Sequence, residues 1–354
     1  MSLDICTKIG NLLIEEKIKD PGLMNGNAGI AIFFYNLAKK TSDKKYQNHA
    51  DALIDEVYRK FNMNINFQDG IAGTGWCIEY LIQNCYCKGN TNEILKGIDT
   101  RIFKFLNEQS EIPFDLRQGL IGYLQYLIMR LKNKKNYKSD EAQINIELLK
   151  FIINKIDRKA TSQFINLTRD FKLHILDDVY MLLWNLNNAF SLNIYNEKII
   201  NMFKQWETYL ISYLPCLNIN RLYLAIILLQ TNRLLKSEKV IKHIDNLLYS
   251  IDINNLELEI DIDIQKMYNV QHGYLGFLLV LTISIQVFNS AYPNYQKLIN
   301  FKNKVTNLYN NRLFNALNET KNTVNNIINT QYGLSDGLAG AGLLLLLKPN
   351  ILTA

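Results

Sequence analysis

The feature that most constrains this chain is a short glycine motif that occurs five times. Each copy has a polar residue, a glycine, two further residues, a second glycine and then an apolar stretch. The apolar residues recur with helical spacing and show no strand-like alternation. Glycine motifs that each begin a helix, repeated along one chain, indicate stacked helical repeats. The first glycines of the five motifs are Gly26, Gly70, Gly119, Gly273 and Gly337.

Two more repeats are expected between Gly119 and Gly273, because this interval is about three times the others. One candidate is the segment 174–178, which precedes the apolar run 179–186. The other is the segment 216–221, which precedes the run 222–229. Both have lost the glycines, so the chain is interpreted as seven repeats, five clear and two degenerate.

Other amphipathic stretches lie between the motifs, and each is long enough for a helix. Seven helix pairs form either an open solenoid or a closed ring. Glycines at the start of every second helix favour the ring, because they let helix ends crowd on an inner circle and tolerate a positive φ at the preceding turn. The chain is therefore expected to be all-α, with one domain over 1–354. The stretches are 4–18, 43–60, 91–108, 140–158, 195–213, 237–250 and 294–316.

Composition excludes several classes of protein. With 48% hydrophobic and 20% charged residues, the chain can bury a large core, so it is not mainly disordered. The net charge of +6 is spread among acids, and no nucleic-acid partner is expected. The apolar run 339–347 is too short to span a bilayer, and the N-terminus does not resemble a signal peptide. Five irregularly spaced cysteines indicate a reducing, cytoplasmic compartment.

The segment 256–264 does not fit the helical pattern. Its apolar and acidic residues alternate strictly, which predicts a strand. Such a strand could lie on the surface of the ring or pair with an extended peptide.

Taken together, the glycine segments resemble the lanthionine synthetase C-like family over nearly the whole chain. The resemblance implies an α/α toroid of seven inner and seven outer helices, which agrees with the seven repeats. It also implies a role in modifying a ribosomally made, lanthipeptide-type peptide. The segments that carry it are GLMNGNAGIAIFF (22–34), FQDGIAGTGW (67–76), DLRQGLIGYLQYL (115–127), VQHGYLGFLLVL (270–281) and YGLSDGLAGAGLLLL (332–346).

The resemblance implies a zinc ion that activates cysteine thiols of the peptide. Zinc coordination makes a thiol a thiolate, and three protein ligands with an open fourth position suit that task. Cys216 and His272 match two of the family's three metal ligands. Gln271 replaces the third, a cysteine, and an amide is a poor zinc ligand.

The family's proton-transfer residues match His174 and Asp115. Two other expected active-site residues, an arginine and a tyrosine, are replaced by Ser212 and Leu217. These departures cluster in the fourth to sixth repeats, where the family's chemistry takes place.

Structural roles also explain these residues. His272 precedes a repeat glycine, as polar residues do in every clear repeat, so a cap or rim role is sufficient. Cys216 could be a small buried apolar residue. A paired structural histidine explains His174, and a helix cap explains Asp115.

Three functions remain open. The first is a bacterial cyclase of antibiotic biosynthesis, which adds cysteine thiols to dehydroalanine or dehydrobutyrine after a partner dehydratase has acted on the precursor peptide. The second is a non-catalytic member that has lost zinc and binds the peptide or a partner enzyme. The third, from fold analogy, is a carbohydrate-active enzyme, which requires Asp69 and Asp336 within about 10 Å of each other.

Overall fold

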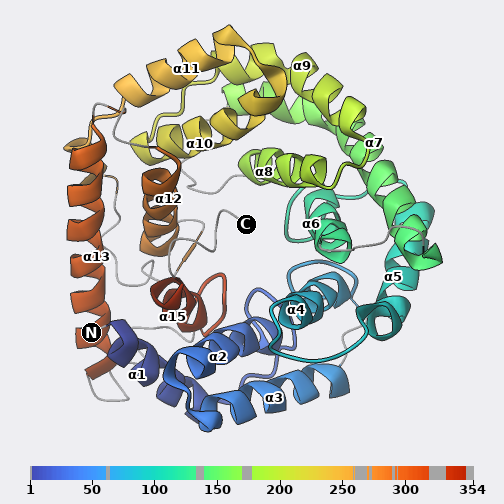
Figure 1. Ribbon diagram of the computed structural model, residues 1–354, viewed down its shortest axis with the longest axis vertical. Coiled ribbons are helices and arrows are strands. Elements are labelled where there is room, and N and C mark those ends of the chain that lie inside the picture. Colours follow the sequence, from blue (N-terminus) through green and yellow to red (C-terminus); the bar gives the residue numbers. More distant parts are fainter. Residues whose placement is uncertain are drawn as a thin grey trace.

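The computed structural model describes residues 2–60, 64–132, 139–169, 178–257, 259, 269–270, 273–288, 292, 294–318 and 332–347, with the side chains of 161–169 and 257 left out. Over these residues the chain forms fourteen α-helices, one short 3₁₀ helix and no strand. The α-helices form an inner and an outer ring (Figure 1). The fold is therefore the all-α toroid that the sequence predicts.

The inner ring contains the helices that follow the glycine motifs and the two degenerate repeats. Each inner helix contacts the next, and the last contacts the first, so the ring closes. The degenerate repeats are confirmed as inner helices, although α10 begins four residues before the predicted apolar run. The inner helices are α2 (Asn27–Thr41), α4 (Ile71–Gln83), α6 (Leu120–Leu131), α8 (Asp178–Ser191), α10 (Asn218–Leu235), α12 (Tyr274–Val287) and α15 (Leu338–Leu346).

The outer ring contains the seven amphipathic stretches. Six of them agree with the structure within three residues at each end, whereas the stretch predicted as 140–158 continues to Arg169. Six outer helices pack against the inner helix that precedes them in the chain. The seventh pair joins the two ends of the chain, because α1 packs against α15. The outer helices are α1 (Ser2–Glu15), α3 (Lys44–Arg59), α5 (Thr91–Glu108), α7 (Asp140–Arg169), α9 (Asn196–Ser212), α11 (Glu238–Tyr249) and α13 (Tyr295–Asn318).

The motif glycines are required for close packing and not for a positive φ. None of the glycines, all of which lie among the described residues, has a positive φ, so that expectation was wrong. A Cβ at Gly119 would lie 2.2 Å from the carbonyl oxygen of Pro113, six residues earlier. A Cβ at Gly73 would lie 2.0 Å from the oxygen of Phe67, again six residues earlier. In these two repeats the loop before the inner helix is folded back so tightly that no side chain fits at the glycine.

A buried ion network joins the second and third repeats. Arg130 of α6 is fully buried and forms ion pairs with Glu79 of α4 at 2.5 Å and with Asp99 of α5 at 2.7 Å. Tyr126 donates a further hydrogen bond to Asp99 at 2.5 Å. Every carboxylate of this network has a partner, which is how buried charge is tolerated.

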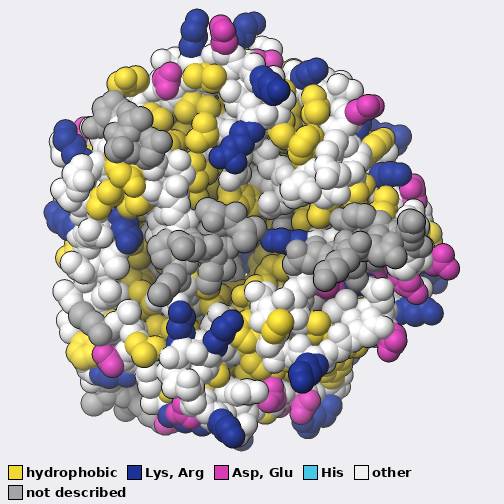
Figure 2. Space-filling model, in the orientation of Figure 1, with side chains coloured by type: hydrophobic (Ala, Val, Ile, Leu, Met, Phe, Trp, Pro, Cys, Tyr) yellow, Lys and Arg dark blue, Asp and Glu magenta, His cyan; other side chains and the backbone are white. Residues whose placement is uncertain are grey.

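None of the described helices combines the length and the apolar character that a membrane span requires. On the face shown in Figure 2, acidic side chains lie mainly along the outer edge, whereas hydrophobic side chains extend towards the middle.

Candidate functional site

A belt of backbone hydrogen bonds joins the loops that precede the inner helices. The amide of Gln68 donates to the carbonyl of Arg117 at 2.9 Å, and that of Met24 to the carbonyl of Gln68 at 2.9 Å. The amide of Ser335 donates to Met24 at 2.8 Å, and that of Val270 to Ser335 at 3.0 Å. We call residues 23–25, 67–68, 116–117, 269–270 and 335–336 the central loop belt. It gathers the N-terminal ends of five inner helices on one face, as the glycine pattern predicts.

Asp336 is the polar centre of the belt. Its carboxylate accepts hydrogen bonds from the side-chain amides of Asn269 at 2.8 Å and Asn25 at 3.2 Å. Arg117 forms an ion pair with the same carboxylate at 3.5 Å. The Asp336 side chain is only 14% exposed, so these contacts largely enclose it. One residue thus connects the loops of the first, third, sixth and seventh repeats.

This arrangement bears on the carbohydrate-active alternative. The Asp336 carboxylate is engaged by three side chains of other repeats, whereas Asp69 accepts a hydrogen bond from Asn64 within its own loop. Each acid thus has its own structural partners. The predicted pairing of these two acids over one cavity stays a prediction.

The belt changes character at the fourth repeat, where the glycines are lost. In the first two repeats the amides of Leu23 and Phe67 donate to a carbonyl oxygen of the next loop. The equivalent amide in the third repeat, that of Leu116, donates at 3.0 Å to a carboxylate oxygen of Asp178. At the third repeat a side-chain carboxylate therefore accepts the hydrogen bond that a loop carbonyl accepts in the first two repeats.

The start of α10 is capped by a distant glutamate. The Glu259 carboxylate accepts hydrogen bonds from the backbone amides of Asn218 at 2.7 Å and Ile219 at 3.1 Å, and from the Asn218 side chain at 2.6 Å. Exposed amides and a positive dipole end at a helix N-terminus favour such an anion. The first two residues of the alternating segment, Leu256 and Glu257, belong to the 3₁₀ turn Asn255–Glu257, so the predicted strand is wrong there. The rest of that segment, Glu259 excepted, lies outside the described residues.

Cys216 lies beside this capped helix end, and its side chain is exposed. The structural alternative of a buried apolar cysteine is therefore wrong. Arg221 turns back towards the loop and donates to the carbonyls of Pro215 at 2.8 Å, Cys216 at 3.4 Å and Ser250 at 2.6 Å. These bonds hold the loop that presents Cys216.

The zinc site implied by the resemblance is not assembled from the described residues. Among them, no three His, Cys, Asp or Glu side chains are grouped so that they could hold a metal ion. His174, Gln271 and His272 lie outside the described part of the chain. One thiol, one imidazole and one amide do not make the three-donor set that zinc requires.

Asp115 has a local structural role. Its carboxylate accepts a hydrogen bond from the Gln118 amide at 2.7 Å, and its carbonyl accepts one from Gly119 at 3.1 Å. It therefore shapes the turn before α6, close to the cap role considered for it. Burial, together with the negative charge of Asp115, raises the pKa of Tyr123 in α6. The acid therefore acts on that buried phenol electrostatically.

The sequence alone does not identify three residues of this region. Arg117 lies directly before the motif that begins at Gln118, so the motif pattern does not include it. Asn269 lies before a motif, and Glu259 lies in the alternating segment. The only sequence signal for Glu259 is that it is one of the alternating acidic residues. That alternation does not indicate its partner, the start of α10.

The comparisons with known proteins agree with this geometry. The family model described as lanthionine synthetase C-like protein matches residues 17–173. Residues 17–173 belong to the lanthionine synthetase C-like family. This lanthionine synthetase C-like part holds α2 to α7, and with them three of the five loops of the central belt.

The solved structure of nisin cyclase is similar to the whole chain. The TM-score is 0.65 with 16% sequence identity, and the match covers 96% of this chain and 92% of that chain. At this identity the likeness shows a shared fold, the lanthipeptide cyclase-type α/α toroid. No curated protein matches the sequence.

Proposed function

We propose that this protein binds the precursor peptide of a lanthipeptide-type pathway on the face of the toroid that carries the central loop belt. The observation that carries the proposal is the match of residues 17–173 to the family, because this segment supplies most of the belt. The repeats that build the belt keep their glycines, whereas Gln271, Ser212 and Leu217 replace residues of the family's chemistry. A binding role needs only the part that is kept.

A second candidate is cyclisation itself, and the exposure of Cys216 favours it. In this reaction the Sγ of a peptide cysteine bonds to the Cβ of dehydroalanine or dehydrobutyrine. The thiol proton leaves sulfur, and the substrate Cα gains a proton, so the mass does not change. His174 and Asp115 are the residues proposed for these proton transfers. This candidate is second because expected active-site residues of the family are replaced by Gln271, Ser212 and Leu217.

Both roles also require particular surroundings. A peptide dehydratase would supply the dehydrated residues, because the addition needs a carbon–carbon double bond. A reducing cytoplasm would keep both the peptide cysteines and the exposed Cys216 as thiols.

The test uses the full-length protein and a synthetic peptide that contains dehydroalanine and cysteine. Binding is measured by fluorescence anisotropy, and ring formation by loss of the iodoacetamide-reactive thiol in mass spectrometry. Metal content is measured by elemental analysis on the wild type, Cys216→Ala and His272→Ala. Peptide binding with an intact thiol and no zinc supports the binding role.

Thiol loss that needs both residues, with stoichiometric zinc that falls in both variants, supports the cyclase instead. The absence of any binding to the folded protein would reject both candidates.

A further inference from the structure

Two cysteines, Cys85 and Cys87, lie in the loop that follows α4, outside the central loop belt. The helix ends in a tight turn, in which the amide of Cys85 donates to the Ile82 carbonyl at 3.0 Å and that of Tyr86 to the Leu81 carbonyl at 2.9 Å. Cys85 adopts the left-handed conformation that commonly ends a helix, with a φ of 59°. This turn exposes Cys85 to solvent, whereas Cys87 is half-buried.

The Cys87 side chain is held by two side chains of the neighbouring helices. Its thiol donates a hydrogen bond to the hydroxyl of Tyr35 in α2 at 3.3 Å, and that hydroxyl donates to the carboxylate of Asp51 in α3 at 2.5 Å. Burial also raises the pKa of Cys87 above its ordinary value. Cys87 is therefore a protonated and shielded thiol, and Cys85 is the thiol of the pair that a reagent in solvent reaches first.

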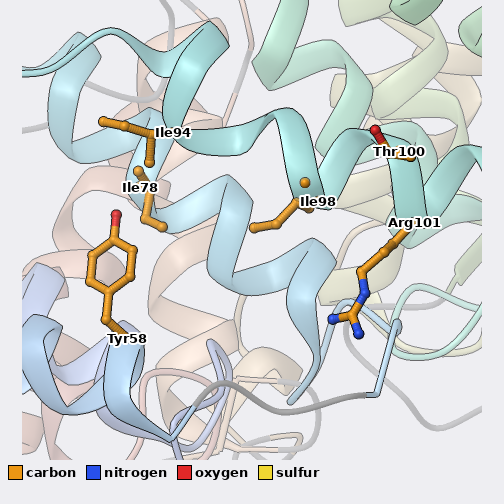
Figure 3. Close-up of a pocket in the computed structure, with 7 residues that line it drawn as sticks. Tyr58, Ile78, Ile94, Ile98, Thr100 and Arg101 are labelled. Carbon is orange, nitrogen blue, oxygen red and sulfur yellow. The ribbon is translucent and has the colours of Figure 1, made fainter.

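The same loop lies next to a cleft and to positive charge. A Cβ at Gly89 would lie 2.6 Å from a methyl carbon of Ile94, which lines a cleft of about 380 Å³ between α3, α4 and α5 (Figure 3). Lys39 lies over the ring of Tyr86 at 5.3 Å, and the exposed Lys88 comes directly after the second cysteine. Ammonium groups beside the two thiols favour reagents that carry carboxylates.

We propose that Cys85 and Cys87 form a redox-active dithiol that reacts with small disulfides carrying carboxylates. The Cα atoms of residues two positions apart are separated by at most about 7 Å, and disulfides join Cα atoms roughly 4.4–6.8 Å apart, so the pair is close enough to be bridged. An accessible cysteine next to a second, resolving cysteine is the usual arrangement of a redox sensor. In a reducing compartment such a disulfide is transient.

The reaction with glutathione disulfide proceeds in two steps. The Cys85 thiolate attacks one sulfur of the reagent, the S–S bond breaks, and one glutathione leaves with the proton that Cys85 has lost. Cys87 then attacks the Cys85 sulfur of the mixed disulfide, and the second glutathione leaves with the Cys87 proton. The protein thus loses two electrons and two protons, and the reagent gains both. Because Cys87 must leave Tyr35 to form the bridge, oxidation removes one contact between this loop and α2.

The experiment treats the reduced full-length protein with glutathione disulfide and locates the products by peptide mass spectrometry. We expect Cys85 and Cys87 to become linked to each other with the loss of two hydrogens. Cys216 is the internal control, because it is also exposed but has no second cysteine in its loop. It should therefore keep any glutathione that it acquires.

Two serine variants separate the steps. Cys87→Ser should stop the reaction at a glutathione adduct on Cys85, whereas Cys85→Ser should leave Cys87 unmodified. If Cys87→Ser fails to fold, the comparison of Cys85 with Cys216 in the wild type still decides.

A pair of charge variants tests the preference for an anionic reagent. Lys88→Glu should slow the oxidation of Cys85 by glutathione disulfide at least about twofold, because it removes a positive charge beside the thiols. Lys297→Glu is the control, since it makes the same change at an exposed residue of α13, in a distant repeat.

The proposal is overturned if wild-type Cys85 keeps its glutathione as Cys216 does, or if Cys85 does not react. It is also overturned if Cys87 is modified in Cys85→Ser, and equal rates for the two charge variants would overturn the preference for an anionic reagent. These outcomes are independent of peptide binding, because the central loop belt lies at the other end of α4.

Discussion

A methyl group is the smallest addition that a glycine can receive, and Gly73 has no room for one. Its Cβ would lie 2.0 Å from the Phe67 carbonyl oxygen, well inside any van der Waals contact. The same geometry recurs at Gly29 with 2.0 Å, at Gly122 with 2.3 Å and at Gly276 with 1.8 Å. At the residue scale, the second glycine of the motif lets an inner helix pack closely against the loop that precedes it.

We expect Gly73→Ala to lower the free energy of unfolding by more than about 2 kcal/mol, because the loop must move away from α4. Gly97→Ala is the matched control, since that site has open space and alanine is the better helix former. It should raise stability by up to about 1 kcal/mol. Urea denaturation of both variants measures the difference; equal effects would contradict the close-approach explanation.

Arg130 offers a second test at the residue scale. Arg130→Met should lower the free energy of unfolding by about 3–5 kcal/mol, because Glu79 and Asp99 would stay buried without their cation. The triple variant Arg130→Met, Glu79→Gln, Asp99→Asn removes the orphaned charges and should recover part of the loss. Thermal and urea unfolding decide, and a triple variant no more stable than the single one would count against this account.

At the scale of elements, local signals predict helices well and contacts between distant segments poorly. The stretch 91–108 coincides with α5, because the Asn90 side chain caps its start by accepting a hydrogen bond from the Asn92 amide. The alternating segment predicts a strand wrongly, because a contact with a distant element fixes Glu259. Its carboxylate accepts hydrogen bonds from the start of α10, some 40 residues away. The Arg117–Asp336 pair joins loops 219 residues apart, and no local pattern encodes such a contact.

Glu259→Gln tests whether that distant cap stabilises α10. The amide keeps an acceptor but loses the charge at the helix end, so we expect a loss of about 1 kcal/mol and faster hydrogen exchange in residues 216–222. Glu238→Gln is the control, because it removes an exposed acid from the first turn of α11, where Ser237 already caps the helix. A similar change in both variants would mean that the Glu259 contact adds nothing.

For the whole molecule, the decisive contact is the one between the two ends of the chain. In an open solenoid the first helix touches only its neighbours in sequence. Here α1 packs against α15 and α13 as well as α2, and its Cys6 thiol lies 3.5 Å from the Gly342 carbonyl of α15. The glycine motifs predict a ring only by inference, because sequence spacing is the same for a solenoid and for a toroid. Closure depends on the buried face of α1 together with the direct contact between α2 and α15.

Ile9→Asp is expected to open the ring. Ile9 is fully buried on α1, so the variant places an unpaired carboxylate in the core and should cost about 3–5 kcal/mol. Leu3→Asp is the control, because Leu3 is 42% exposed on the same helix and the change should cost less than about 0.5 kcal/mol. Hydrogen exchange distinguishes the architectures. In a closed ring Ile9→Asp speeds exchange in α2 and in α15 together, at opposite ends of the chain, whereas in an open solenoid only α2 would respond.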